Sequence, residues 1–305
     1  MTQAQTTAPD SFVDVKNIGK VVYDGVAFET WYPCLGYFDP DQKRVELVRP
    51  LLEPDQAPST VIKYIDELHV CHGCFKYSIR REDIKGHIPA CTRISKPPGN
   101  LVYKSPKYAI RRVQGSSESD HLFCQCMCLF GKLFLDSKTI FYAVDGFEFY
   151  VLYDNSNNVP VGFFSKELNS WDDYNLACIL VFPPFQSKGL GKLLIAFSYH
   201  LSQVQNKVGS PERPLSKYGW ASYMSYWCQQ VCMVVANWDE DAISVDQIAQ
   251  ATAIRQEDIY EALKHMGALE DDQIYLDAIY DRIRARKVRM DRYIDPKYCV
   301  RRLRQ

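Results

Sequence analysis

VFPPFQSKGLGKLLIAFSYHL, residues 181–201, is the stretch that decides the fold. An apolar segment (174–182) ends in two prolines, and the glycine turn 186–191 leads into apolar residues at every third or fourth position. This pattern predicts a central strand, a tight turn and a helix. Glycines at such a turn let backbone N–H groups approach an anion, and the helix N-terminus adds a partial positive charge. The sequence therefore predicts an anion site, with a phosphate as its natural ligand.

Two common phosphate motifs do not fit this turn. A Walker loop needs glycine where Gln186 stands and serine or threonine where Leu193 stands, which argues against a nucleotide triphosphatase. The dinucleotide fingerprint needs a third glycine where Leu194 stands. The remaining pattern, Q-x-x-G-x-G, is similar to the pyrophosphate loop of coenzyme A-dependent N-acetyltransferases. Taken alone, it also fits a strand–helix turn that binds no ligand.

The composition is that of an ordinary globular protein, with 305 residues of which 47% are hydrophobic and 24% are charged. No apolar run reaches the ~18–20 residues of a membrane span. The polar start MTQAQTTAPDS lacks the hydrophobic core of a signal peptide. We therefore expect a soluble intracellular protein without membrane association, beginning with a disordered leader at residues 1–12.

The cysteines indicate a metal site rather than disulfides. Their number, eleven, is odd, and no signal peptide is evident. Four residues follow the spacing C-x2-C-x12-H-x3-C, which suits the tetrahedral N/S coordination of a structural zinc ion. These are Cys71, Cys74, His87 and Cys91. The alternative is a set of unlinked buried cysteines, and His72 is a rival donor. A single finger of this kind is not expected to read DNA bases, a role that usually needs tandem modules.

Other segments predict a mixed α and β chain. Residues 13–50 predict a small antiparallel β unit, 139–167 two or three strands with turns at 145–146 and 154–158, and 95–100 (SKPPGN) a linker. In the last third, Ser244 and Gln247 fit a capping box and Gly267 fits a helix C-cap. Two predicted helices around TAIR (252–255) resemble a helix-turn-helix pair.

The charges are unevenly distributed. Residues 282–305 carry ten Lys/Arg and two Asp, whereas the rest of the chain carries 26 Lys/Arg and 35 Asp/Glu. This basic segment predicts contact with nucleic-acid phosphates or with an acidic protein surface. An equal alternative is a solvated helix end that pairs with the acidic body. The basic residues singled out for phosphate contact are Arg282, Arg284, Arg286, Lys287 and Arg289.

Four stretches together resemble the MYST family of histone acetyltransferases, and especially its short fungal silencing-type members. They are WYPCLGYF (31–38), CLFGKLFLDSKTIFYAVDGFEFYVLYD (128–154), VGFFSKE with YNLACILVFPPFQSKGLGKLLIAFSYHLS (161–202), and GSPERPLSKYGWASYMSYW (209–227). The resemblance implies an α/β (mixed α+β) fold with a GNAT-like acetyl-CoA N-acyltransferase core at 101–209. It also implies an N-terminal lobe at 13–100, which carries the C2HC zinc finger at 71–91, and a winged-helix-like helical lobe at 210–305.

The same resemblance implies that the glycine turn binds acetyl-CoA. The residues that match the cofactor-binding positions lie on the strand, in the turn and in RPLSK. They are Ile179, Leu180, Val181, Phe182, Gln186, Ser187, Lys188, Gly189, Leu190, Gly191, Lys192, Leu193 and Ser216.

Acetyl transfer to a lysine side chain requires the lysine amine to be neutral. Because a free lysine titrates near ~10.4, neutralising it at pH ~7.4 costs roughly 4 kcal/mol unless a base takes the proton. By resemblance, Glu212 is this general base and Cys178 lines the active site. A Cys178 thiolate taking the acetyl group first, and direct transfer with Glu212 acting alone, both remain open. Backbone amides near Cys178 and Ile179 are candidate oxyanion donors.

The resemblance also implies that the enzyme acetylates its own Lys138, although Ser137 stands where the family usually has histidine. Lys217 is a second departure, at a position where the family commonly has aspartate, and it bears on substrate preference. The implied substrate is a histone tail lysine, most specifically in histone H4, within nucleosomes. The implied setting is the nucleus, in a complex with accessory subunits that regulates silencing or transcription.

Two alternatives to this function stay open. The chain could acetylate a different histone or a non-histone protein. It could also be a zinc-finger and helix-turn-helix chromatin-binding module whose acetyltransferase core is inactive. Tight DNA binding without acetyl-CoA binding would favour the second alternative, although sequence-specific DNA reading is not expected.

Overall fold

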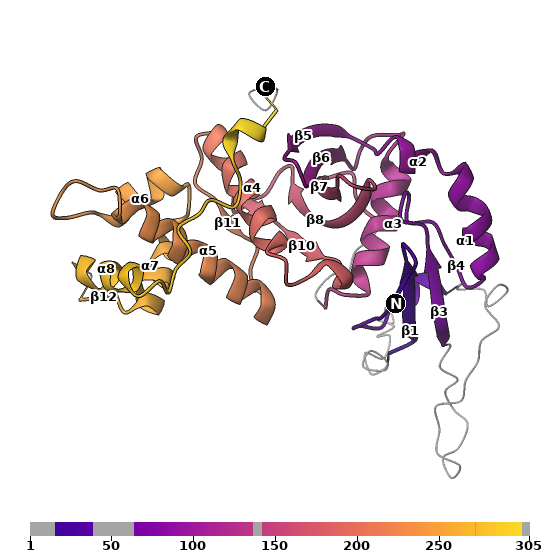
Figure 1. Ribbon diagram of the computed structural model, residues 1–305, viewed down its shortest axis with the longest axis horizontal. Coiled ribbons are helices and arrows are strands. Elements are labelled where there is room, and N and C mark those ends of the chain that lie inside the picture. The colour runs from indigo at the N-terminus through magenta and orange to yellow at the C-terminus, as the bar shows by residue number, and fades with distance from the viewer. Residues whose placement is uncertain (1–15, 39–63, 137–141, 272, 301–305) are drawn as a thin grey trace, which may run out of the picture. The chain divides into compact units, whose positions relative to one another are not determined.

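The computed structural model describes residues 16–38, 64–136, 142–271 and 273–300, and they divide into two compact units (Figure 1). The first unit combines residues 1–97 with 122–143, and the second combines 98–121 with 144–305. The boundary at Pro97 falls within the predicted linker 95–100. The predicted leader, Ser137, Lys138 and the last five residues lie outside the described residues.

The first unit contains a four-stranded sheet in the order β2-β1-β3-β4. Its strands are β1 (Ile18–Tyr23), β2 (Val26–Glu29), β3 (Ile65–Val70) and β4 (Tyr77–Ser78). The predicted antiparallel unit is confirmed for β1 and β2. However, β1 pairs in parallel with β3, with Ile18 opposite Ile65, a register that short-range alternation of residues could not reveal.

Short helices and one longer helix complete the first unit. The short ones are η2 (Leu35–Tyr37), α1 (Arg81–His87), η3 (Ile88–Ala90) and α2 (Thr92–Ser95). The longer helix is α3 (His121–Lys132). This helix buries Phe130 against Phe75, with ring centroids 5.4 Å apart. Directly after the helix, the Leu133 carbonyl accepts hydrogen bonds from the backbone N–H groups of Trp31 and Tyr32.

The second unit is built on a five-stranded antiparallel sheet in the order β10-β8-β7-β6-β5. Its strands are β5 (Asn100–Lys104), β6 (Tyr108–Gln114), β7 (Phe147–Asp154), β8 (Val159–Glu167) and β10 (Cys178–Val181). Helix α4 (Leu190–Val204) follows the 3-10 helix η4 (Pro183–Phe185) and covers the sheet with the leucines and the phenylalanine of its periodic face. The predicted helix after the glycine turn is thereby confirmed.

The strand predicted at 174–182 is not central. The chain breaks at Ala177 into β9 (Tyr174–Leu176) and β10, and β10 is an edge strand of the five-stranded sheet as described. The break occurs because β9 pairs in parallel with β11 (Ser210–Pro211), whereas β10 pairs with β8. Apolar content reports burial but not the number of hydrogen-bonded neighbours, and Phe182 at the end of this stretch is fully buried.

The rest of the second unit is helical and winged-helix-like. Its elements are α5 (Lys217–Val235), α6 (Val245–Thr252), α7 (Gln256–Met266), β12 (Leu269–Glu270), β13 (Gln273–Ile274), α8 (Leu276–Arg284) and η5 (Pro296–Tyr298). The capping box of Ser244 and Gln247 and the left-handed C-cap at Gly267 are both present. The core and the helical part are not separated at residue 209, because α4 and α5 share one core in which Trp227 donates to the Tyr199 hydroxyl at 2.8 Å.

No helix among the described residues combines the length and apolar character needed to cross a membrane. The predicted mixed α/β architecture is confirmed.

Candidate active site and metal cluster

The glycine turn forms an open N-terminus on α4. Gly189 is the N-cap residue with a φ of 78°, and Ser187 also has a positive φ, of 61°. The Gln186 side chain closes the turn by donating to the Val181 carbonyl at 2.8 Å. No side chain of the described residues caps the helix, so the first-turn N–H groups are directed outward. Such a terminus attracts an anion.

A cavity of about 550 Å³ adjoins this turn, and Gly189 and Lys192 line it. Lys192 Nζ lies 2.7 Å from the Ser225 hydroxyl of α5 and 5.7 Å from the Tyr293 ring centroid. Three further cations, Arg282, Lys287 and Arg289, lie on the cavity wall. The excess of positive charge complements a phosphorylated ligand, and the volume is within the usual ~300–1,000 Å³ of small-molecule sites.

Sequence reasoning missed most of this cavity. Ser225, Gln229 and Tyr293 line it, yet nothing in their local pattern marked them. For the basic segment, the sequence predicted contact with nucleic-acid phosphates or an acidic protein surface, or a solvated helix end. The structure places Arg282, Lys287 and Arg289 on the wall of this cavity, which also includes Gly189 at the N-terminus of α4.

Cys178 lies half-buried at the start of β10, where the chain changes sheet partners. Its backbone N–H donates to the Ser165 hydroxyl at 3.1 Å, and the N–H of Ala177 donates to the Ser165 carbonyl at 2.8 Å. The Cys178 amide is therefore engaged, and the expectation that it serves as an oxyanion donor is not met in this conformation.

Glu212 is attached to the same place in the sheet. It follows β11, and its N–H donates to the Leu176 carbonyl at 2.8 Å, two residues before Cys178. The residue is exposed. Ser216 is the N-cap of α5 and accepts from the Gly219 N–H at 3.1 Å. Lys217 is the first residue of this helix and is exposed.

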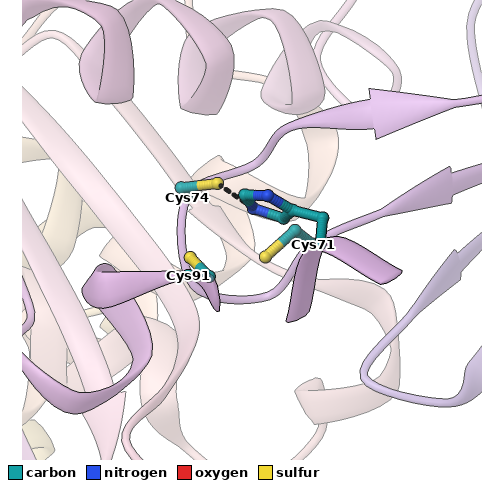
Figure 2. A group of neighbouring side chains, drawn as sticks. Cys71, Cys74 and Cys91 are labelled. Atoms are coloured by element: carbon teal, nitrogen blue, oxygen red, sulfur yellow. Dashed lines mark hydrogen bonds between the residues drawn. The ribbon is translucent and has the colours of Figure 1, made fainter. Parts of the chain in front are cut away.

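The four predicted metal ligands come together in the first unit. The ligand atoms of Cys71, Cys74, His87 and Cys91 all lie within 4.8 Å of one another. Figure 2 shows the three cysteine side chains around a common centre, and the Cys74 sulfur lies 3.2 Å from His87 Nε2. His87 ends α1, and Cys91 follows the intervening turn η3 as the N-cap of α2, so the two are not on one helix.

The chemistry of this donor set fits zinc. The N–H of Gly73 points at the Cys71 sulfur at 3.4 Å, as in a metal knuckle that favours thiolate. The Cys74 thiol donates to Cys71, which lowers the pKa of Cys71 and raises the pKa of Cys74. His72 does not join the cluster, because its Nδ1 lies 3.4 Å from Asp24 Oδ1. The four ligands can complete a tetrahedral site without an open position.

The MOZ/SAS family model matches residues 96–298, which include the whole of the second unit's sheet, turn and cavity. The chain belongs to the MOZ/SAS family. This membership confirms the predicted resemblance.

Several curated proteins that are similar to this chain are named as histone acetyltransferases. The chain is 42% identical over 256 residues to histone acetyltransferase SAS2 of Saccharomyces cerevisiae, covering 83% of this chain and 75% of that protein. It is 37% identical over 263 residues to a putative MYST-like histone acetyltransferase 1 of Oryza sativa, covering 86% of this chain and 53% of that protein. Histone acetyltransferase MOF of Drosophila melanogaster is 36% identical over 264 residues, covering 86% of this chain and 29% of that protein. The predicted enzyme class is thereby confirmed.

Proposed function

We propose that this chain transfers the acetyl group of acetyl-CoA to the ε-amine of a histone tail lysine, with histone H4 as its substrate and Glu212 as the general base. The observation that carries the proposal is the short stretch of chain that joins the base and the cofactor turn. The Glu212 N–H donates to the Leu176 carbonyl at the end of β9, and the chain runs from there through Cys178 and β10 into the anion-binding turn. The candidate base, Cys178 and the turn therefore follow one another along this stretch.

Acetyl-CoA fits the edge of β10 and the turn that follows. On an edge strand, the backbone groups that face away from β8, apart from the Val181 carbonyl that accepts from Gln186, can bind the amides of a pantetheine arm. The first-turn N–H groups of α4 suit the pyrophosphate, and the cationic cavity suits the nucleotide end. The proposed binding residues are those of the sequence analysis, 179–182, 186–193 and Ser216, and to them we add Ser225.

The role of Glu212 follows from the protonation of the substrate. The carboxylate would accept the lysine proton as the amine attacks, which removes the roughly 4 kcal/mol cost of a neutral amine at pH ~7.4. Cys178 lines the proposed site on the strand next to Leu176. Transfer through a Cys178 acyl intermediate and direct transfer with Glu212 acting alone predict different initial-rate patterns.

We also propose a structural zinc ion held by Cys71, Cys74, His87 and Cys91. With four protein ligands, it would supply folding energy and no catalytic position. The nuclear location, the accessory subunits, the silencing role and the autoacetylation of Lys138 remain parts of this proposal. The nuclear location and the silencing role are supported by the likeness to the histone acetyltransferases named above, whereas the accessory subunits and the autoacetylation rest on the sequence resemblance alone.

The experiment that tests the proposal is acetyl transfer from labelled acetyl-CoA to a panel of histone tail peptides and to nucleosomes, with products located by mass spectrometry. Labelling of an H4 tail lysine above the other peptides supports it. Labelling of another histone alone would remove the H4 substrate and keep the enzyme. Tight DNA binding by zinc-loaded protein that neither binds acetyl-CoA nor labels any substrate would instead indicate the chromatin-binding module.

A glycine pair tests the acetyl-CoA site. Gly189→Ala should raise the Kd for acetyl-CoA about tenfold or more, because its methyl group enters the anion site. Gly267→Ala is the matched control. Both glycines have left-handed φ values, 78° and 69°, and no described atom within 4 Å of an added Cβ. Each substitution should destabilise the fold by about 1 kcal/mol. Equal acetyl-CoA affinities by titration calorimetry in the two variants would contradict the assignment.

A further inference from the structure

The second helix of the helix-turn-helix pair does not have the charge of a DNA reader. Its first turn carries Glu257 and Asp258, and Glu261 follows one turn later. Negative charge on this face opposes a phosphate backbone. The face is instead occupied by Arg213, the residue directly after Glu212. Helix α7 therefore has a partner within the chain, at the loop that carries the proposed base.

Arg213 is held by three groups. Its Nη2 lies 2.7 Å from Asp258 Oδ1 and 3.2 Å from Glu261 Oε2, and its Nη1 lies 3.4 Å from Glu261 Oε1. The guanidinium carbon lies 5.5 Å from the Trp227 ring centroid. The Asp258 side chain is only 2% exposed, against 35% for Arg213. A carboxylate buried to this degree needs its cation, since removing one partner of such a pair leaves an uncompensated charge.

The loop is fixed to the same helix pair on the other side of Glu212. The Gly209 N–H donates to the Ala253 carbonyl at 2.8 Å, and the Arg255 N–H donates to the Gly209 carbonyl at 3.0 Å. The Ser210 hydroxyl and Arg213 both act to lower the pKa of Asp258, although burial outweighs them and raises it. Asp258 thus interacts with residues on both flanks of Glu212. The backbone of Glu212 itself is bonded to Leu176.

We propose that Arg213 and Asp258 form a positioning pair that holds the Glu212 carboxylate in the direction of the lysine amine. The inference rests on the proposed role of Glu212 as base. Because a displacement of about 1 Å can cost ~10²-fold in rate, a loop that carries the base gains from being fixed on both flanks. The pair also holds the Arg213 cation against α7.

A pair that positions Glu212 and a pair that only stabilises the fold predict different pH dependences of kcat/KM. In Asp258→Asn, Arg213 keeps the half-buried Glu261 and the Trp227 ring but loses its buried carboxylate partner, so it can reach Glu212. An arginine beside the base would lower the pKa of the base. The acid limb of the kcat/KM profile should therefore move to lower pH while kcat falls. Arg213→Met removes that cation, so it should lower kcat without this displacement.

The test compares Arg213→Met, Arg213→Lys, Asp258→Asn and the Arg213→Met/Asp258→Asn double variant in zinc-loaded full-length protein. Arg284→Met is the matched control, because Arg284 forms an exposed ion pair with Asp281 within α8. We expect kcat for the histone peptide to fall about 10–100-fold in each single substitution to Met or Asn, with a smaller fall for lysine. The double variant should fall no further than the worse single one, with the Kd for acetyl-CoA within about twofold.

Unchanged kcat in folded Arg213→Met would overturn the inference, as would losses that only follow the fraction of folded protein. If Asp258→Asn does not fold, the variants at the half-exposed Arg213 still test the positioning pair. Glu212→Gln, measured in parallel, separates the two hypotheses. If it remains active, the proposed base is wrong; if it is inactive while the Arg213 variants match wild type, only the positioning pair is wrong.

Discussion

Glu212→Gln should lower kcat/KM for the histone peptide by about 10²–10⁴-fold at pH ~7.4, the usual range for loss of a positioned base. Glutamine has nearly the shape of glutamate, and the residue is exposed, so the free energy of unfolding should change by less than about 0.5 kcal/mol. Initial rates with labelled acetyl-CoA measure the loss, and titration of acetyl-CoA should show unchanged affinity.

The pH dependence makes this prediction specific. Between pH ~7 and the lysine pKa near ~10.4, an increasing fraction of the substrate amine is already neutral. The ratio of wild-type to variant activity should therefore shrink as pH rises. Glu257→Gln serves as control, since Glu257 is an exposed glutamate in the same unit. A ratio that is constant with pH would show that Glu212 acts in some way other than as a base.

The parts of the site that could be predicted from sequence are those fixed by local spacing. The candidate zinc ligands are four residues within a 21-residue segment, and their spacing predicted that their donor atoms would come together. The turn and α4 could likewise be predicted, because the glycines lie next to the leucines that repeat at helical spacing. Glu212 and Cys178 were named by resemblance. The hydrogen bond that attaches Glu212 to Leu176, two residues before Cys178, depends on the β9–β11 pairing, which no local sequence pattern contains.

The features that could not be predicted have the same physical origin. The strand at 174–182 is apolar enough to be buried, but its edge position depends on which strands pair with it. The basic residues after 282 carry a charge that any anion would complement, so sequence could not distinguish a cavity wall from a nucleic-acid surface. The partnership of Arg213 with Asp258 joins residues 45 apart and follows only from the packing of α7.

Removing zinc should unfold the region of the first unit around α1 and α2. These helices have seven and four residues, far below the ~12–15 that an isolated helix needs. The local apolar cluster is small: two of its three fully buried members, Cys71 and Cys91, are themselves ligands. Structural zinc contributes about 10–16 kcal/mol in small domains. Cys91→Ala, or a strong chelator, should therefore abolish bound zinc and expose this region to protease. Cys126→Ser, outside the cluster, should not.

A glycine pair shows whether the geometry of the site matters beyond its ligands. A Cβ on Gly73 would lie 2.5 Å from Ile94 Cγ1 and 3.0 Å from the Cys91 sulfur, so Gly73→Ala should displace a ligand and lower zinc affinity with all four donors present. Gly86→Ala on α1 meets no described atom within 4 Å and should stabilise the helix by about 0.5–1 kcal/mol. Zinc release measured with a colorimetric chelator should be faster in the first variant and unchanged or slower in the second. Equal release would mean that the cluster is held by something other than this knuckle.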